Sequence, residues 1–241
     1  LHVIRHSFPT RRSSDLPLLE LNILKNFQFS INLFCALLLF ICIAASIIIV
    51  PFYLQNVLKL TPLHTGFFMM ISPLVLAVLS PFCGNLSDKI GSEIMTVVGL
   101  FFMAVGFFFM SRLVESSTII ECAVSVIVVA LGQALFQPAN NSLIMSSCPR
   151  NKLGIVGSIN ALVRNLGLIS GITLSTTLLY KFMSMKINYH VVDYVKGRDD
   201  VFVYGMKHVY LIIVGICIIG FLITAYRLYQ VKTKIEIELN K

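Results

Sequence analysis

A glycine, an acid, a base and a second glycine stand together in a short polar stretch between two apolar blocks. The stretch reads GNLSDKIGSE from residue 84 to 93 and holds Gly84, Asp88, Lys89 and Gly91. The glycines permit a tight reversal and close backbone approach, and the Asp88 carboxylate can sit at the positive amino end of a helix and pair with a base. We expect a charged loop that joins two helices. The alternative is an ordinary polar turn in which the aspartate caps a helix.

Arg164 is a permanent cation inside an apolar block. An arginine at the centre of a bilayer costs about 2.5–3.5 kcal/mol on insertion scales, so it rarely faces lipid and needs a partner. Asn160 and Asn165 are close in sequence, and Glu121 is the only carboxylate near a membrane interior. Arg164 could line a substrate path or steady an interface. The alternative is a side chain that extends to the membrane surface.

Two prolines lie near the ends of apolar blocks. Pro51 lies near the end of the block at 31–54, and Pro138 lies among Gln137, Asn140 and Asn141. A proline frees backbone carbonyls and kinks a helix, which suits a gate or a cavity wall. The alternative is a tolerated kink of the kind that membrane spans often contain.

Gly167 and Gly171 form a G-x-x-x-G pattern. Small residues at this spacing allow a neighbouring helix to approach closely, so we expect these two glycines to serve helix packing.

The elements that carry these residues are expected to be membrane spans. Hydrophobic residues make up 57% of the 241 residues, charged residues only 12%, and the mean hydropathy is +0.87, far outside the range of soluble domains. Since a backbone in lipid must satisfy its own hydrogen bonds, each long apolar block predicts a helix. The predicted spans are 31–54, 65–83, 94–110, 119–136, 154–180 and 204–229, with a solvated loop at 181–203.

The sequence does not show the residue patterns that several other functions require. The six cysteines are scattered singly and no histidine has metal-ligand spacing, so we expect apolar filler, no metal and no cofactor. The net charge of +8 is spread among loops and forms no stripe that would bind nucleic acid. The residue patterns of an intramembrane enzyme or a channel filter are not visible.

The first sixteen residues differ from everything that follows. HSFPTRRSSDL, at residues 6–16, resembles the conceptual translation of a common sequencing-library adapter. We interpret 1–16 as an adapter-derived, disordered artefact, 17–230 as the six-helix unit and 231–241 as a cytoplasmic tail. The alternative is a basic amino-terminal arm. The artefact reading implies that an upstream half of the protein is missing.

The polar stretch resembles the G-x-L-[SA]-D-[RK]-x-G-[RK]-[RK] signature of the major facilitator superfamily. Gly84, Asp88, Lys89 and Gly91 match, whereas the last two positions are Ser92 and Glu93 instead of bases. Together with PLLELNILKNFQF at 17–29, PFYLQ at 51–55 and the run from 132 to 171, the chain resembles the last six helices of the fourteen-helix drug:proton antiporters of the EmrB/QacA type.

This resemblance implies an all-α membrane protein that forms one major facilitator half, built from two inverted three-helix repeats. It also implies both termini in the cytoplasm, a plasma membrane of bacterial type, and a proton as coupling ion in the full-length protein. The implied partners are lipid, the missing amino-terminal half and a small hydrophobic or cationic substrate. Since no span carries a carboxylate at mid-depth, we do not expect this chain alone to transport. A metabolite or nutrient carrier of the same superfamily, or a six-helix membrane protein without transport activity, stays open.

Overall fold

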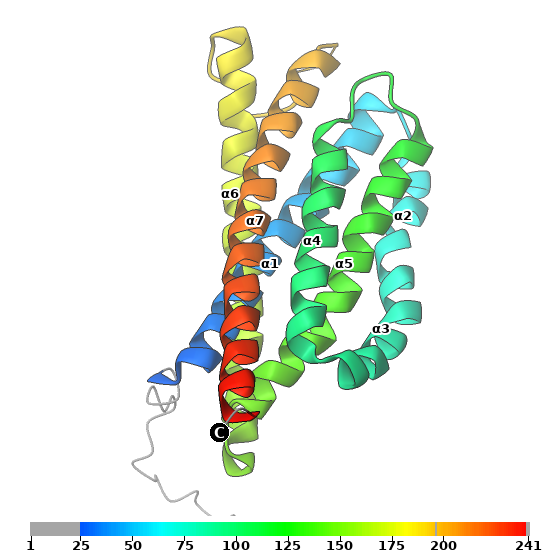
Figure 1. Ribbon diagram of the computed structural model, residues 1–241. Helices are drawn as coiled ribbons and strands as arrows, with labels where there is room; N and C mark the ends of the chain where they lie inside the picture. Colours follow the sequence, from blue (N-terminus) through cyan, green and yellow to red (C-terminus); the bar gives the residue numbers. More distant parts are fainter. Residues whose placement is uncertain (1–24, 196, 240–241) are drawn as a thin grey trace, which may run out of the picture.

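The computed structural model describes residues 25–195 and 197–239, and every regular element in these ranges is helical. Six helical segments are long and apolar enough to cross a membrane, which confirms the predicted all-α membrane fold (Figure 1). The elements are α1 (Phe27–Phe52), the π-helix η2 (Tyr53–Val57), α2 (Pro62–Met69), α3 (Ile71–Ile90), α4 (Ser92–Ser111), α5 (Ile119–Ser146), the 3-10 turn η3 (Arg150–Lys152), α6 (Leu153–Ile187) and α7 (Asp199–Leu239).

Polar side chains cap the apolar helices. The Asn26 carboxamide oxygen accepts from the backbone N–H of Gln28 at the start of α1. At the start of α5, Thr118 and Glu121 form a reciprocal capping box, which satisfies two backbone donors that a helix leaves free. Glu121 therefore lies in the first turn of α5, at one end of this span and not near its middle.

Several predicted helix ends are wrong, and in each case the helix is longer than predicted. The helix α3 continues to Ile90, so residues 84–90 are helical, and only Gly91 separates α3 from α4. Helix α5 runs ten residues past the predicted end at 136, and the predicted loop at 181–203 shrinks to 188–198. Polar residues in the last turns of a helix lower the local hydropathy, although the backbone hydrogen bonds continue through them.

Two predictions concern the ends of the sequence, namely the artefact at 1–16 and the tail at 231–241. Residues 1–16 lie outside the described residues. The backbone of α7 stays helical to Leu239, so no helix end marks the predicted boundary at residue 230, although the apolar span itself ends at Gln230.

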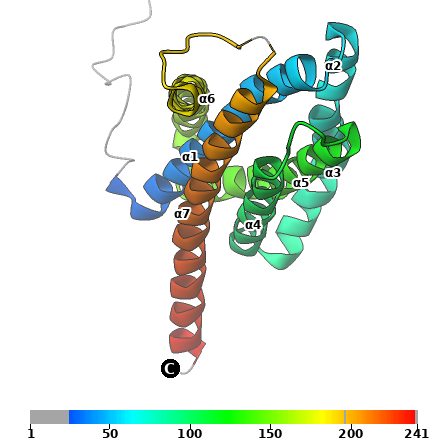
Figure 2. The ribbon, with the colours of Figure 1, turned by 90° about the horizontal axis from the view of Figure 1, so that it is seen from above.

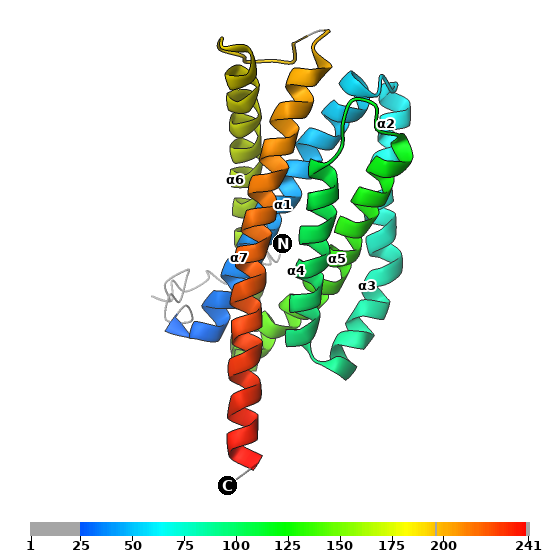
Figure 3. The ribbon, with the colours of Figure 1, turned by 45° about the horizontal axis from the view of Figure 1, so that its top comes forward.

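The packing of the six spans has the symmetry of an inverted repeat. The first repeat is α1, α3 and α4, and the second is α5, α6 and α7. The extensive α1–α6 contact is matched by the α3–α5 contact, and the α4–α5 contact corresponds to a much smaller α1–α7 contact. Exchanging the two repeats leaves this set of helix pairs unchanged, as expected for a major facilitator half. Figures 2 and 3 show α6 and α7 on one flank and α2 and α3 on the other, with α1 crossing between them.

Glycines set the closest helix contacts. A Cβ on Gly132 of α5 would lie 2.6 Å from the backbone oxygen of Gly99 in α4. A Cβ on Gly171 of α6 would lie 2.6 Å from the backbone oxygen of Ile41 in α1. Since no side chain fits at such distances, these pairs of helices touch backbone to backbone.

Burial is uneven across the bundle. About half of the apolar window is buried in α1, α4 and α5 (56%, 50% and 50%), but only 11% in the span formed by α2 and α3, 28% in α6 and 33% in α7. The helices α3 and α6 occupy equivalent positions in the two repeats. These two symmetry-related helices therefore expose most of their surface, and so does α7.

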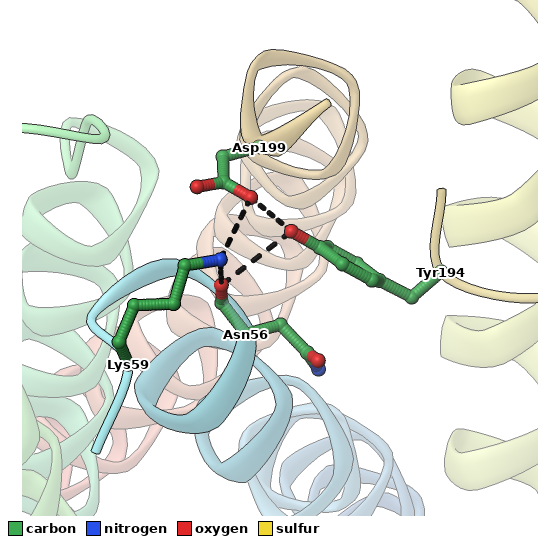
Figure 4. A network of polar contacts seen from close by, with 4 residues as sticks. All are labelled: Asn56, Lys59, Tyr194 and Asp199. Carbon is green, nitrogen blue, oxygen red and sulfur yellow. Dashed lines mark hydrogen bonds and ion pairs between the residues drawn. The ribbon is translucent and has the colours of Figure 1, made fainter. Parts of the chain in front are cut away.

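A polar network lies at the end of the bundle opposite the start of α1 and the end of α7 (Figure 4). The Lys59 ammonium lies 3.3 Å from the Asp199 carboxylate and also donates to the backbone oxygen of Asn56. The Tyr194 hydroxyl donates to Asp199 and lies 3.4 Å from the same Asn56 oxygen. Desolvation and the neighbouring Asp199 carboxylate raise the pKa of Tyr194 to about 12. The network ties the π-helical end of the first span to the start of α7.

Candidate functional site

A small pocket lies between the first helices of the two repeats, α1 and α5, and is completed by α2, α3 and α4. We call it the central pocket. Its lining residues are Ile43, Ser46, Ile47, Val50, Phe68, Met69, Ser72, Met110, Val126, Val129 and Gln133. On α1 these residues lie close to the middle of the span Phe27–Val57, so the pocket is inside the membrane-spanning part of the bundle.

The central pocket is apolar with a few hydrogen-bonding groups. Its polar side chains are Ser46, Ser72 and Gln133, and no acid or base occurs among the eleven described lining residues. The Ser46 hydroxyl lies 3.6 Å from the Met110 sulfur. Methionine and aromatic side chains make adaptable walls, and the hydroxyl and amide groups can orient a ligand without charge. The volume is about 70 Å³, whereas drug-sized ligands occupy pockets of about 300–1,000 Å³. The pocket is therefore too small for a whole drug-sized ligand.

Polar junctions between helices lie beyond both ends of the pocket. Near the carboxy-terminal end of the first span, the Tyr53 hydroxyl donates to the backbone oxygen of Val114 at 2.8 Å. Near the start of α1, the Asn140 amide donates to the backbone oxygen of Asn32 at 3.3 Å and so joins α5 to α1. Hence α1 is attached near each of its ends, with the pocket between the attachments.

The predicted Asn140 and Asn141 take part in an amide cluster where α1, α5 and α6 meet. Asn141 accepts a hydrogen bond from the Asn160 amide at 2.9 Å. The side-chain oxygens of Asn32 and Asn140 are buried and have no hydrogen-bond partner among the described residues. Because a buried unpaired acceptor is costly, the junction is poised to accept a further donor.

The two predicted prolines have different surroundings. Directly after Pro51, α1 changes into the π-helix η2, a form that is frequent at functional sites. Pro138 lies inside α5, which stays helical through it, and both it and Gln137 are half-buried. Local backbone rearrangement is thus found at Pro51 and not at Pro138.

The signature residues surround the α3–α4 junction. Asp88 and Lys89 are exposed in the last turn of α3, so the expectation that Asp88 lies at the amino end of a helix is wrong. Glu93 has that place, in the first turn of α4. Gly84 is half-buried, and a Cβ there would meet nothing within 4 Å. Gly91 has φ +104°, a conformation that favours glycine.

Arg164 and Asn165 are both exposed on α6. The Arg164 guanidinium lies over the Phe40 ring, 5.3 Å from its centroid, within the range of a cation–π contact. Among the described residues it has no ion-pair partner. The packing of Gly167 and Gly171 against α1 is what brings Arg164 to Phe40, because a Cβ on Gly167 would lie 2.7 Å from the Phe40 Cβ.

Sequence reasoning missed a buried cation, Arg227 of α7. Its Nη2 donates to the Thr96 hydroxyl of α4 at 3.2 Å, while its Nε is buried without a hydrogen-bond partner among the described residues. The same reasoning left Ser46, Ser72 and Gln133 unassigned. An available signal was the placement of Arg227 inside an apolar block, but serine and glutamine in a span carry no comparable signal.

These features define a class of protein. Six spans in two inverted repeats, with a mid-membrane pocket between the first helices of the repeats, are the architecture of one half of a secondary transporter. The sequence profile of the major facilitator superfamily matches residues 5–172. The chain belongs to the major facilitator superfamily.

Known proteins with similar sequences are transporters. The chain is 27% identical to the riboflavin transporter RibZ of Clostridioides difficile over 86% of its length. It is 29% identical to the uncharacterized transporter YebQ of Escherichia coli over 89% of its length, and 25% identical to the multidrug export protein EmrB of Haemophilus influenzae over 70%. It covers 44% of each of the first two relatives and 33% of the third. The chain therefore spans less than half the length of these relatives.

Proposed function

We propose that the chain is the carboxy-terminal half of a proton-coupled multidrug exporter of the fourteen-helix antiporter type. Its substrates are small hydrophobic or cationic compounds, moved by alternating access between two six-helix halves. The observation that carries the proposal is the central pocket, in which apolar and methionine side chains surround three uncharged polar groups. Such a wall suits compounds of varied shape that are held mainly by apolar contact.

The exposed helices support the need for a companion half. The span of α2 and α3 and the helix α6 leave most of their residues uncovered, on opposite flanks of α1 (Figure 2). A second six-helix unit that covers both flanks would face the pocket between α1 and α5. The pocket of about 70 Å³ would then become part of a cavity large enough for a drug-sized ligand, about 300 Å³ or more.

The coupling proton is assigned to the companion half. The described acidic residues lie at helix ends or in links, as Glu93, Glu121 and Asp199 illustrate. A coupling acid must be reachable from both sides in turn, which favours a position near mid-membrane. In this proposal the chain resides in a bacterial plasma membrane with both termini in the cytoplasm.

Transport by the reassembled protein is the decisive experiment. The open reading frame is extended upstream in the genome, and the full-length protein is produced in a bacterial strain without its own drug pumps. Inside-out vesicles are energised with a proton gradient, and uptake of a fluorescent lipophilic cation is followed with and without a protonophore. We expect uptake that the protonophore abolishes. Equal uptake by vesicles without the protein would refute the proposal.

A second candidate function is a metabolite carrier. The observation in its favour is the similarity to a riboflavin transporter over 86% of the chain. The same vesicles are tested with radiolabelled riboflavin against the lipophilic cation. Saturable riboflavin transport without cation transport would favour the carrier, because a dedicated carrier recognises its substrate through specific hydrogen bonds.

A further inference from the structure

Arg164 is exposed on α6 at the edge of the face that packs on α1. It lies three residues before Gly167 and seven before Gly171, so it shares their face of the helix, and these two glycines pack tightly on α1. Leu162, Leu166 and Ile169, on the side of α6 turned away from α1, are 48%, 51% and 65% exposed. The helix thus presents one exposed cation beside α1, next to an uncovered and mostly apolar side.

The contact with Phe40 fixes the depth of this cation. Phe40 lies two residues from the midpoint of the span Phe27–Val57, and the Arg164 guanidinium is 5.3 Å from its ring centroid. At about 1.5 Å per residue, this span of 31 residues is about 46 Å long and exceeds the hydrocarbon core of about 30 Å. With the span centred on the core, Phe40 lies about 12 Å inside the nearer edge. That is farther than an arginine side chain reaches, so the cation lies within the core.

The described part of the chain offers no anion at this depth. Asn160, the nearest buried amide on α6, already donates to Asn141. Glu121 is engaged in the capping box of α5, and the described ion pairs involve Lys59 with Asp199 and Arg198 with Asp200, near the start of α7. The same described residues of a second copy of the chain would also offer no anion at this depth.

We propose that α6 docks, along the exposed edge beside α1 that carries Arg164, against a spanning helix of the companion half that places an aspartate or glutamate opposite Arg164. This inference rests on the proposed function, since it requires a companion half. The carboxylate neutralises a mid-membrane charge, and the Phe40 ring holds the guanidinium in the position that the carboxylate meets. The pair then fixes the register of α6 against the other half.

Charge exchange in the full-length transporter tests the proposal. Arg164→Glu is expected to lower both proton-driven export and the amount of protein in the membrane by about tenfold or more, since it opposes two buried carboxylates. Each acidic residue in the spanning helices of the companion half is then replaced by arginine in the Arg164→Glu background. We expect one such double variant to restore export and accumulation. Arg112→Glu, an exposed cation in the link after α4, is the matched control and should change neither.

Each remaining outcome has a defined meaning. Wild-type export by Arg164→Glu, or no rescuing double variant, overturns the docking pair. Loss of transport for anionic compounds alone, with normal accumulation, shows that Arg164 binds substrate and also overturns it. If the unaltered full-length protein exports nothing, the proposed function fails, while rescue of accumulation still tests the docking pair independently.

Discussion

The contact of α6 with α1 predicts a sharp response to one added methyl group. In Gly171→Ala, the new Cβ would lie 2.6 Å from the Ile41 backbone oxygen and 2.7 Å from the Ala44 Cβ. An ordinary carbon contact is about 3.5–4.0 Å, so the two helices must separate by close to 1 Å. Because the obstacle is largely backbone, no side-chain rotation relieves it.

The expected loss of stability follows from the cost of overpacking a core. We expect the free energy of unfolding to fall by about 1–3 kcal/mol. If the six-helix unit unfolds as one cooperative unit of about 150–250 residues, that lowers its Tm by about 2–12 °C. Separating α6 from α1 also weakens the contact of Arg164 with Phe40, so the change reaches the proposed docking surface.

Gly157→Ala is the matched control. Its Cβ would meet only the flexible Met145 Cε, at 3.7 Å, and the substitution also replaces glycine by alanine within α6. Both variants are purified in detergent from the full-length protein, and thermal unfolding is followed by far-ultraviolet circular dichroism, since this chain has no tryptophan. A Tm for Gly171→Ala that equals or exceeds the Tm of Gly157→Ala would refute the reasoning.

Four further predictions address other parts of the chain. Gln133→Leu removes an amide from the central pocket and should lower export of hydrogen-bonding compounds more than that of apolar ones, measured as the ratio of initial rates in vesicles. The raised pKa of Tyr194, about 12, means that its contribution to stability is complete below about pH 10 and is lost as pH rises through 12; Tyr194→Phe should flatten that part of a Tm-against-pH curve, and an unchanged slope would contradict the role of Asp199. Gly91→Ala forces a side chain into a backbone with φ +104° and should cost about 1–3 kcal/mol, measured by thermal unfolding. Long-read sequencing of the source locus should show other codons in place of those for residues 1–16. If the present codons are found in the genome, the adapter interpretation is wrong.

The sequence was sufficient for the spans because hydropathy is a local property. Each span is long enough to cross the bilayer, and its apolar composition is written in consecutive residues, as in the block around Ile43 and Ile47. The helix ends were less predictable. The residues from Gly84 to Ile90 read as a loop because they are polar, yet their backbone continues the hydrogen bonding of α3.

The candidate site was only partly predictable. Arg164 and Asn140 stood out because charged and amide groups are costly in lipid. Ser46, Ser72 and Gln133 did not, because serine and glutamine in a span are as often packed against a neighbouring backbone as aimed at a cavity. Arg227 did not stand out because it lies near the end of its block, although it is buried against Thr96.

The sequence by itself indicated a membrane protein, its all-helical class and its superfamily, because each depends on composition or on residues close together in the chain. Only the tertiary structure decided which side chains share a pocket, which helices match in the two repeats and where Arg164 lies in depth. Those features depend on how distant segments pack, and the packing is set by backbone contacts such as that of Gly171 with Ile41, which no local pattern records.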